Sequence, residues 1–173
     1  MIHETTGSQL NLVATTPSGK TTLFEFPLSA AQKYPAQLIA RNKVFPENAQ
    51  INDTAYHQGV MYLTGTLDNS LFVGRYHQRR LFFPENSDLY DKEQGLNLKL
   101  SPDGVSLYVT GKRYEDTPYP LFIRQYDSQQ LKPVASFGNN GKAIITINHI
   151  VTVNNQQDIL IQKDQIYVAV FSP

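Results

Sequence analysis

The residues of this sequence that could bind a metal or act as nucleophiles are few and scattered. The chain has no cysteine, so it has no thiol nucleophile, no disulfide and no cysteine-ligated metal. None of its four histidines stands two or four positions from another, the spacings that place two imidazoles on one face of a strand or a helix. These histidines are His3, His57, His77 and His149. We therefore predict no metal site and no cofactor.

Serine and carboxylate residues are present, but none stands in a pattern typical of a catalytic site. No serine occupies the strand–turn–helix elbow of hydrolases. Residues 14–21 end in Gly19-Lys20-Thr21 and formally match a phosphate-binding loop, which requires a helix directly after it. Residues 22–27 alternate as a strand instead, so a hairpin turn is the better interpretation. The sequence favours a non-catalytic protein. A hydrolase or lactonase whose residues converge from distant loops at a channel mouth stays open as the alternative.

The first candidate for a binding surface is a long turn at residues 112–120. It is four residues longer than the corresponding turn near Asp68, and function in repeat folds is concentrated in such insertions. It combines tyrosine with arginine, residue types that are enriched in binding hot spots. We predict that Arg113, Tyr114 and Tyr119 contact a protein or glycan partner. The alternative is a proline-stiffened loop that packs on its neighbour.

The second candidate is a row of basic residues at positions 75–79. Arg75, His77 and Arg79 are spaced two apart in a strand-like segment, so their side chains are expected on one face of that strand. Arg75 and Arg79 are predicted to receive a carboxylate, because guanidinium groups pair with carboxylates in a bidentate geometry. The alternative is a solvated row that guards a strand edge against unwanted pairing.

Composition narrows the choice of partner and compartment. The 173 residues include 15 Lys and Arg against 15 Asp and Glu, so the formal net charge is zero. A neutral chain has no long-range field for phosphate backbones or anionic lipid, and we predict no nucleic-acid partner. No apolar run approaches the roughly 18 residues of a membrane-spanning helix. The low charge, the absence of cysteine and the amide-rich surface favour a periplasmic, cell-surface or secreted bacterial protein, with a cytoplasmic one as the alternative.

Hydrophobic alternation predicts strands from end to end. Apolar residues recur at every second position in several short runs, among them residues 10–14, 96–100, 107–111 and 166–170. These runs are rich in Tyr, Phe, Val, Ile and Thr, and clusters of Gly, Pro, Asn and Asp separate them. The predicted fold class is therefore all-β.

Internal repeats make the prediction more specific. A hairpin at residues 60–65 and 71–76 recurs at residues 105–111 and 121–126, and degenerate copies occupy residues 10–15 with 22–26 and residues 165–170. A phenylalanine turn follows each complete hairpin, at Phe45, Phe83 and Phe137. The spacing between copies suits four short strands and their turns.

Two segments carry a family resemblance. Residues 98–110, with the turn Ser101-Pro102-Asp103-Gly104, resemble the blade signature of bacterial β-propellers of the YVTN type. Residues 121–141, with Tyr126-Asp127 and the turn at 137–141, resemble propeller repeats of the delta-sixty type. The resemblance implies a propeller blade and assigns no catalytic residue.

The repeats therefore predict a single domain, residues 1–173, built as a β-propeller or propeller fragment of about three to four blades. The approximate units are 7–50, 51–95, 96–145 and a partial unit at 146–173. Because propellers typically have four to eight blades, we expect a fragment of a longer chain, an atypical small ring, or a homo-oligomer that completes the ring. A β-sandwich is the structural alternative. The expected function is an interaction module, with a structural domain of a larger surface or assembly protein as a further alternative.

Overall fold

The computed structural model describes residues 2–6, 9–15, 21–27, 39–41, 45–84, 92–114, 121–145, 157–162 and 165–170. All secondary-structure elements within these ranges are β-strands, which confirms the predicted all-β class. None of the described residues forms a helix long and apolar enough to cross a bilayer.

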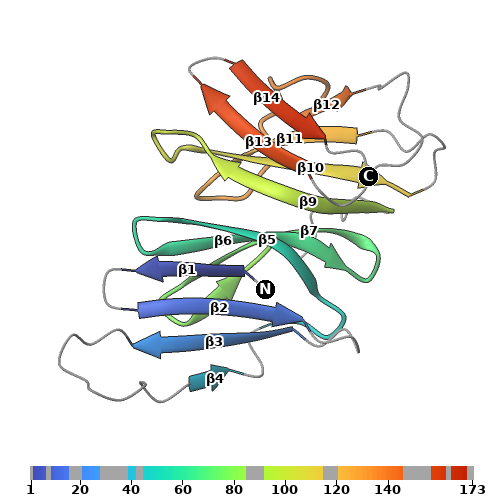
Figure 1. Ribbon diagram of the computed structural model, residues 1–173. Coiled ribbons are helices and arrows are strands. Elements are labelled where there is room, and N and C mark those ends of the chain that lie inside the picture. The colour runs from blue at the N-terminus through green and yellow to red at the C-terminus, as the bar shows by residue number, and fades with distance from the viewer. Residues whose placement is uncertain are drawn as a thin grey trace.

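The strands form four antiparallel sheets in which consecutive strands pair (Figure 1). The first sheet contains β1 (Ile2–Thr6), β2 (Gln9–Thr15), β3 (Thr21–Pro27) and β4 (Ile39–Arg41). The second contains β5 (Gln50–His57), β6 (Val60–Leu67), β7 (Ser70–His77) and β8 (Arg80–Phe82). The third contains β9 (Glu93–Leu100), β10 (Ser106–Arg113), β11 (Leu121–Asp127) and β12 (Lys142–Ile145). The fourth contains β13 (Gln157–Gln162) and β14 (Gln165–Val170). The predicted hairpins are thus confirmed as β2–β3, β6–β7 and β10–β11.

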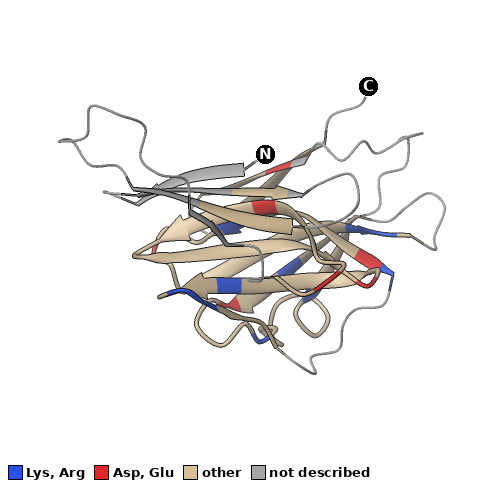
Figure 2. Cartoon of the chain, turned by 90° about the horizontal axis from the view of Figure 1, so that it is seen from below, with Lys and Arg blue, Asp and Glu red and all other residues tan. Residues whose placement is uncertain are grey.

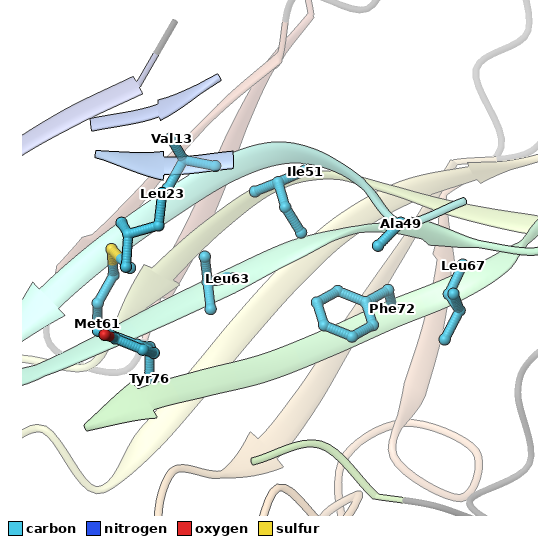
Figure 3. Close-up of a cluster of buried hydrophobic side chains, with 9 residues drawn as sticks. All are labelled: Val13, Leu23, Ala49, Ile51, Met61, Leu63, Leu67, Phe72 and Tyr76. Atoms are coloured by element: carbon cyan, nitrogen blue, oxygen red, sulfur yellow. The ribbon is translucent and has the colours of Figure 1, made fainter. Parts of the chain in front are cut away.

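The second sheet lies between the first and the third, and it is buried on both faces (Figure 1). Leu63 and Phe72 belong to one buried hydrophobic cluster with Val13 and Leu23 of the first sheet (Figure 3). Side chains on the other face of the second sheet join side chains of the third sheet in a second core. Its buried members are Tyr62, Leu71, Val73, Leu98, Leu107, Val109, Phe122, Tyr126 and Leu131. Double-sided burial explains why β6 is an almost continuous buried run instead of an alternating one.

Three two-residue turns connect the strands of the second sheet, at intervals of ten residues. The turn residues are Gln58-Gly59, Asp68-Asn69 and Gln78-Arg79, and all six have positive φ, as type I′ turns require. The third of these turns corrects the sequence prediction for Arg79. Strand β7 ends at His77, so Arg79 lies in the turn with a φ of 66° and does not share a strand face with Arg75.

The turn between β9 and β10 has the predicted Pro-Asp-Gly geometry. The Gly104 N–H donates to the Ser101 carbonyl (2.8 Å), and the Ser101 hydroxyl donates to Asp103 Oδ1 (2.5 Å). The Val105 N–H also donates to Asp103 Oδ1 (3.0 Å). Gly104 has a φ of 74°, a conformation that side chains disfavour, so the glycine closes the turn at little steric cost.

A β-bulge explains the Thr-Gly pair that recurs on the second strands of the second and third sheets, as Thr64-Gly65 on β6 and Thr110-Gly111 on β10. The register of β5 shifts at Asn52 opposite Gly65, and the register of β9 shifts at Leu96 beside Gly111. A Cβ atom on Gly65 would collide with the carbonyl oxygen of Gln50, and one on Gly111 with the carbonyl oxygen of Gln94. The repeated glycines are therefore required by a bulge that recurs in the first strands of the second and third sheets.

The third sheet also holds a buried ionic cluster. Glu93 Oε2 accepts hydrogen bonds from Arg124 Nε (3.0 Å) and Nη2 (2.8 Å), and both side chains are only 4% exposed. Lys142 Nζ donates to the other carboxylate oxygen of Glu93. The cations of Arg124 and Lys142 lie 5.5 and 5.3 Å from the ring centre of Phe122. Both oxygens of this buried carboxylate are thus satisfied by charged donors.

Candidate functional site

The first strands of the four sheets lie next to one another. Strand β1 contacts β5, β5 contacts β9, and β9 contacts β13. We call these four the inner strands. Three of them, together with the turn after β9, enclose a cleft of about 500 Å³, which is within the usual size of small-ligand sites. Its lining residues are Asp53, Thr54, Ala55, Tyr56, His57, Asn97, Leu98, Lys99, Leu100, Ser101, Pro102 and Asp158.

Side chains of β5 tie the second sheet to the third at the cleft. Asp53 Oδ2 accepts a hydrogen bond from the Leu98 N–H on β9 (2.8 Å), and Oδ1 accepts one from the Thr54 N–H (2.9 Å). Asn52 Nδ2 donates to the Gly95 carbonyl on β9 (2.6 Å). An inner strand has one edge without a sheet partner, and its backbone groups need partners when they are shielded from water. Asn52 and Asp53 supply them.

Strand β13 repeats part of this arrangement. Asp158 Oδ1 accepts a hydrogen bond from the Ile159 N–H (2.8 Å), as Asp53 does from the residue that follows it. The two carboxylates occupy equivalent positions in the strand register. Asp53 pairs with Thr64, which lies two positions after the repeat tyrosine Tyr62. Asp158 pairs with Ala169, which lies two positions after the repeat tyrosine Tyr167. Two of the inner strands, β5 and β13, thus carry equivalent aspartates at the cleft.

Asp53 has a perturbed acidity. Burial raises the pKa of its carboxyl from 3.8 to about 6, and the negative charge of Asp158 acts in the same direction. The hydrogen bonds from Leu98 and Thr54 and the positive charge of Lys99 oppose the increase. Burial is the largest cause because it disfavours the charged carboxylate. The Asp53 carboxyl is therefore half protonated near pH 6.

The far end of the cleft is formed where the turn after β9 meets the end of β5. A Cβ atom on Gly104 would collide with the imidazole of His57, so this glycine allows the turn to approach the ring closely. The pKa of the Asp103 carboxyl is lowered by the hydrogen bond from Ser101, then by the one from the Val105 N–H, with a smaller contribution from His57. The Asp103 carboxylate, beside this end of the cleft, therefore stays anionic over a wider pH range than that of Asp53.

The chemistry of the lining is mixed. It offers two carboxylates, the exposed ammonium group of Lys99, the imidazole of His57 and the phenol of Tyr56. Within the described ranges, no group of three or more His, Cys, Asp or Glu residues could hold a metal ion. Figure 2 shows basic and acidic residues interspersed over the described part of the chain. The cleft can therefore bind polar ligands through hydrogen bonds and single ion pairs.

The predicted long turn begins at the opposite end of the third sheet's hairpin. Arg113 is the last residue of β10 and Tyr114 follows it, whereas Tyr119 lies outside the described residues. The Tyr114 hydroxyl donates to Gln94 Oε1 (2.6 Å), and its ring lies 5.7 Å from the ammonium of Lys112. Burial raises the pKa of Tyr114 and lowers that of Lys112. Tyr114 is 43% exposed, so part of its ring faces solvent.

The predicted basic row does not form a single surface. The Arg75 guanidinium lies 4.9 Å from the ring centre of Phe82, directly opposite on β8, and His77 Nδ1 lies 3.0 Å from the Gly59 carbonyl oxygen. Arg75 stands near the end of β7, whereas Arg113 precedes the start of the corresponding strand β11. The structure therefore does not bring Arg75 and Arg79 together with Arg113 and Tyr114, and none of the four lines the cleft.

Sequence reasoning missed the cleft because the repeat was defined on the second and third strands of each unit. The signal was present in the first strands: Asp53 and Asp158 each stand nine positions before the tyrosine that marks the repeat, Tyr62 or Tyr167. Aligning the first strands would have placed these carboxylates at one equivalent position.

No family model matches this chain, and no curated protein or solved structure is significantly similar to it.

Proposed function

We propose that this protein is a non-catalytic binding module built from propeller-type sheets, and that the cleft between the inner strands receives a protein loop or a glycan. The observation that carries the proposal is the cleft itself, which three strands from three different sheets line with polar side chains. Binding sites on repeat folds commonly form where equivalent elements converge. The resemblance to YVTN-type and delta-sixty-type blades supports the same architecture.

The bonding of the aspartates supports binding over catalysis. Both oxygens of Asp53 accept backbone N–H groups, and one oxygen of Asp158 does so. A general base must reach its substrate's proton with an unused lone pair, and each of these N–H groups occupies one lone pair of the oxygen that it bonds. The groups available to a ligand include those of Lys99, His57 and Tyr56 and the second carboxylate oxygen of Asp158, which suit recognition of hydroxyls and carbonyls.

A titration followed by NMR tests the proposal. Panels of soluble oligosaccharides and short peptides are added to isotope-labelled protein, and we expect saturable shifts of the backbone amides of residues 54–57 and 99–101. Lys99→Ala should weaken the binding of any ligand found in this way by about tenfold, because it removes a charged hydrogen-bond donor. Lys132→Ala is the matched control, since Lys132 is exposed and lies outside the cleft. Shifts confined to residues outside the cleft would contradict the proposal.

The acidity of Asp53 favours a second candidate, a hydrolase or lactonase in which this carboxyl transfers protons. A carboxyl whose pKa is about 6 holds or releases a proton near neutral pH, as general acid–base catalysis requires. This candidate predicts hydrolysis of a lactone or ester panel that follows the Asp53 titration and is lost in Asp53→Asn. Equal turnover by the wild type and Asp53→Asn would exclude it.

A further inference from the structure

In the described part of the chain, the second strand of the fourth sheet has an edge that differs from those of the second strands in the other three sheets. In the first three sheets, the second strand is paired on both sides: β2 with β1 and β3, β6 with β5 and β7, and β10 with β9 and β11. Strand β14 occupies the same position in the fourth sheet, but it pairs only with β13 among the described residues. Its second edge therefore presents backbone N–H and C=O groups that no described strand satisfies.

The outer strands of the first three sheets and three of the inner strands have recognisable protections. The outer strands β4, β8 and β12 have only three, three and four residues, and β4 and β8 each contain an arginine. Short length and basic residues are two of the means by which proteins prevent edge-to-edge pairing. On the inner strands, the side chains of Asn52, Asp53 and Asp158 bond to edge backbone groups.

Strand β14 has none of these protections. It is six residues long, Gln-Ile-Tyr-Val-Ala-Val, with no charged residue, no proline and no glycine. Isoleucine, tyrosine and valine are strong strand formers, and an uncharged segment of this kind is primed to pair with another strand.

The face beside this edge carries two exposed hydrophobic side chains among polar ones. Tyr167 is 48% exposed and stands directly opposite Leu160 on β13, which is 58% exposed. In the second sheet, the equivalent tyrosine, Tyr62, is only 5% exposed because the third sheet covers it. A strand added at β14 would extend the sheet beside Tyr167 and bring new side chains against its ring.

We propose that β14 pairs with β14 of a second copy of this chain, antiparallel and about a two-fold axis. The dimer would contain a continuous sheet in the order β13-β14-β14-β13, which has four strands, as the other three sheets do. A two-fold arrangement requires a self-complementary surface, and an uncharged strand meets this requirement because no like charges face each other. The net charge of zero adds no long-range repulsion between copies.

A matched pair of charge variants tests the pairing. Ala169→Lys adds a basic residue to the exposed face of β14, and Gln162→Lys adds the same residue to the exposed face of β13, one strand away from the edge. In sedimentation velocity over a wide concentration range, we expect the wild type and Gln162→Lys to dimerise. We expect the dissociation constant of Ala169→Lys to rise by about tenfold or more. Unchanged circular dichroism and thermal melting of both variants would show that they are folded.

Hydrogen exchange locates the interface. As the protein concentration rises, the amides of residues 165–170 should exchange more slowly, whereas those of β8, another sheet edge, should not change. A monomer at every concentration would overturn the proposal. A dimer whose β14 exchange does not respond to concentration would also overturn it, as would equal disruption by the two lysine variants.

Discussion

At the scale of single residues, Asp53 links the acidity of the cleft to the stability of the fold. Its carboxyl binds a proton more tightly in the folded chain than in the unfolded one, because the pKa rises from 3.8 to about 6. A group with a raised folded pKa contributes full stability below its unfolded pKa, and this contribution is lost as the pH rises through the folded value. Stability from Asp53 is therefore present below about pH 4 and disappears above about pH 6.

The first prediction concerns this titration. Between pH 4 and 7, the free energy of unfolding of the wild type should fall relative to that of Asp53→Asn, by on the order of 2 to 3 kcal/mol, because asparagine carries no charge to bury. Urea unfolding of both proteins across this range measures the difference. Carbon NMR gives the carboxyl pKa directly, with Asp103 as an internal reference that should titrate below the ordinary range. An Asp53 pKa near 3.8 would refute the prediction.

The second prediction concerns Glu93. Glu93→Gln leaves Arg124 buried without its carboxylate partner, and breaking such a pair costs about 3 to 5 kcal/mol. Urea denaturation of the variant measures this loss. The control is Glu47→Gln, because Glu47 is exposed and its replacement should change the stability by less than about 0.5 kcal/mol. Similar stabilities of the two variants would mean that the ionic cluster contributes little.

At the scale of elements, the turns decide which strands pair and in what register. Gln78 and Arg79 both adopt positive φ, which costs about 1 to 2 kcal/mol for an ordinary side chain. Replacing the pair by Asn-Gly, the preferred residues of a type I′ turn, should stabilise the protein by about 1 kcal/mol, as measured by urea unfolding. Arg79→Ala removes the same charge, but alanine also disfavours a positive φ, so this variant should not be more stable than the wild type. If it stabilises the protein equally, charge and not conformation is the cause.

The turns also show how far sequence reasoning extends. Asp68-Asn69 and Pro102-Asp103-Gly104 have the side chains that favour turns, and both were predicted. Gln78-Arg79 has no such signal, because neither residue favours positive φ, and Arg79 was therefore assigned to the strand. The turn is imposed by the pairing of β7 with β8. The cleft was missed for a related reason: its carboxylates acquire their roles from neighbouring sheets, which local pattern does not reveal.

At the scale of the whole molecule, protection from solvent should decrease outward from the second sheet. Strand β6 is central in a sheet that is buried on both faces, whereas β12 is a short edge strand in which Ile144 is 62% exposed. Native-state hydrogen exchange should therefore give β6 amides opening free energies near the global value and β12 amides much lower ones. Equal protection of the two strands would mean that the sheets open only together.

The ten-residue interval between the turns of the second sheet has a kinetic consequence. Each of its pairings joins neighbours in sequence through a two-residue connection, so this sheet closes only short loops. In the third sheet, by contrast, residues 114–120 separate β10 from β11 and residues 128–141 separate β11 from β12. Short loops close quickly and at low entropic cost. The second sheet is thus expected to form first and to serve as the template on which both neighbours condense. Substitutions in β6 should slow refolding, while those in β12 should mainly accelerate unfolding, a contrast that stopped-flow measurements resolve.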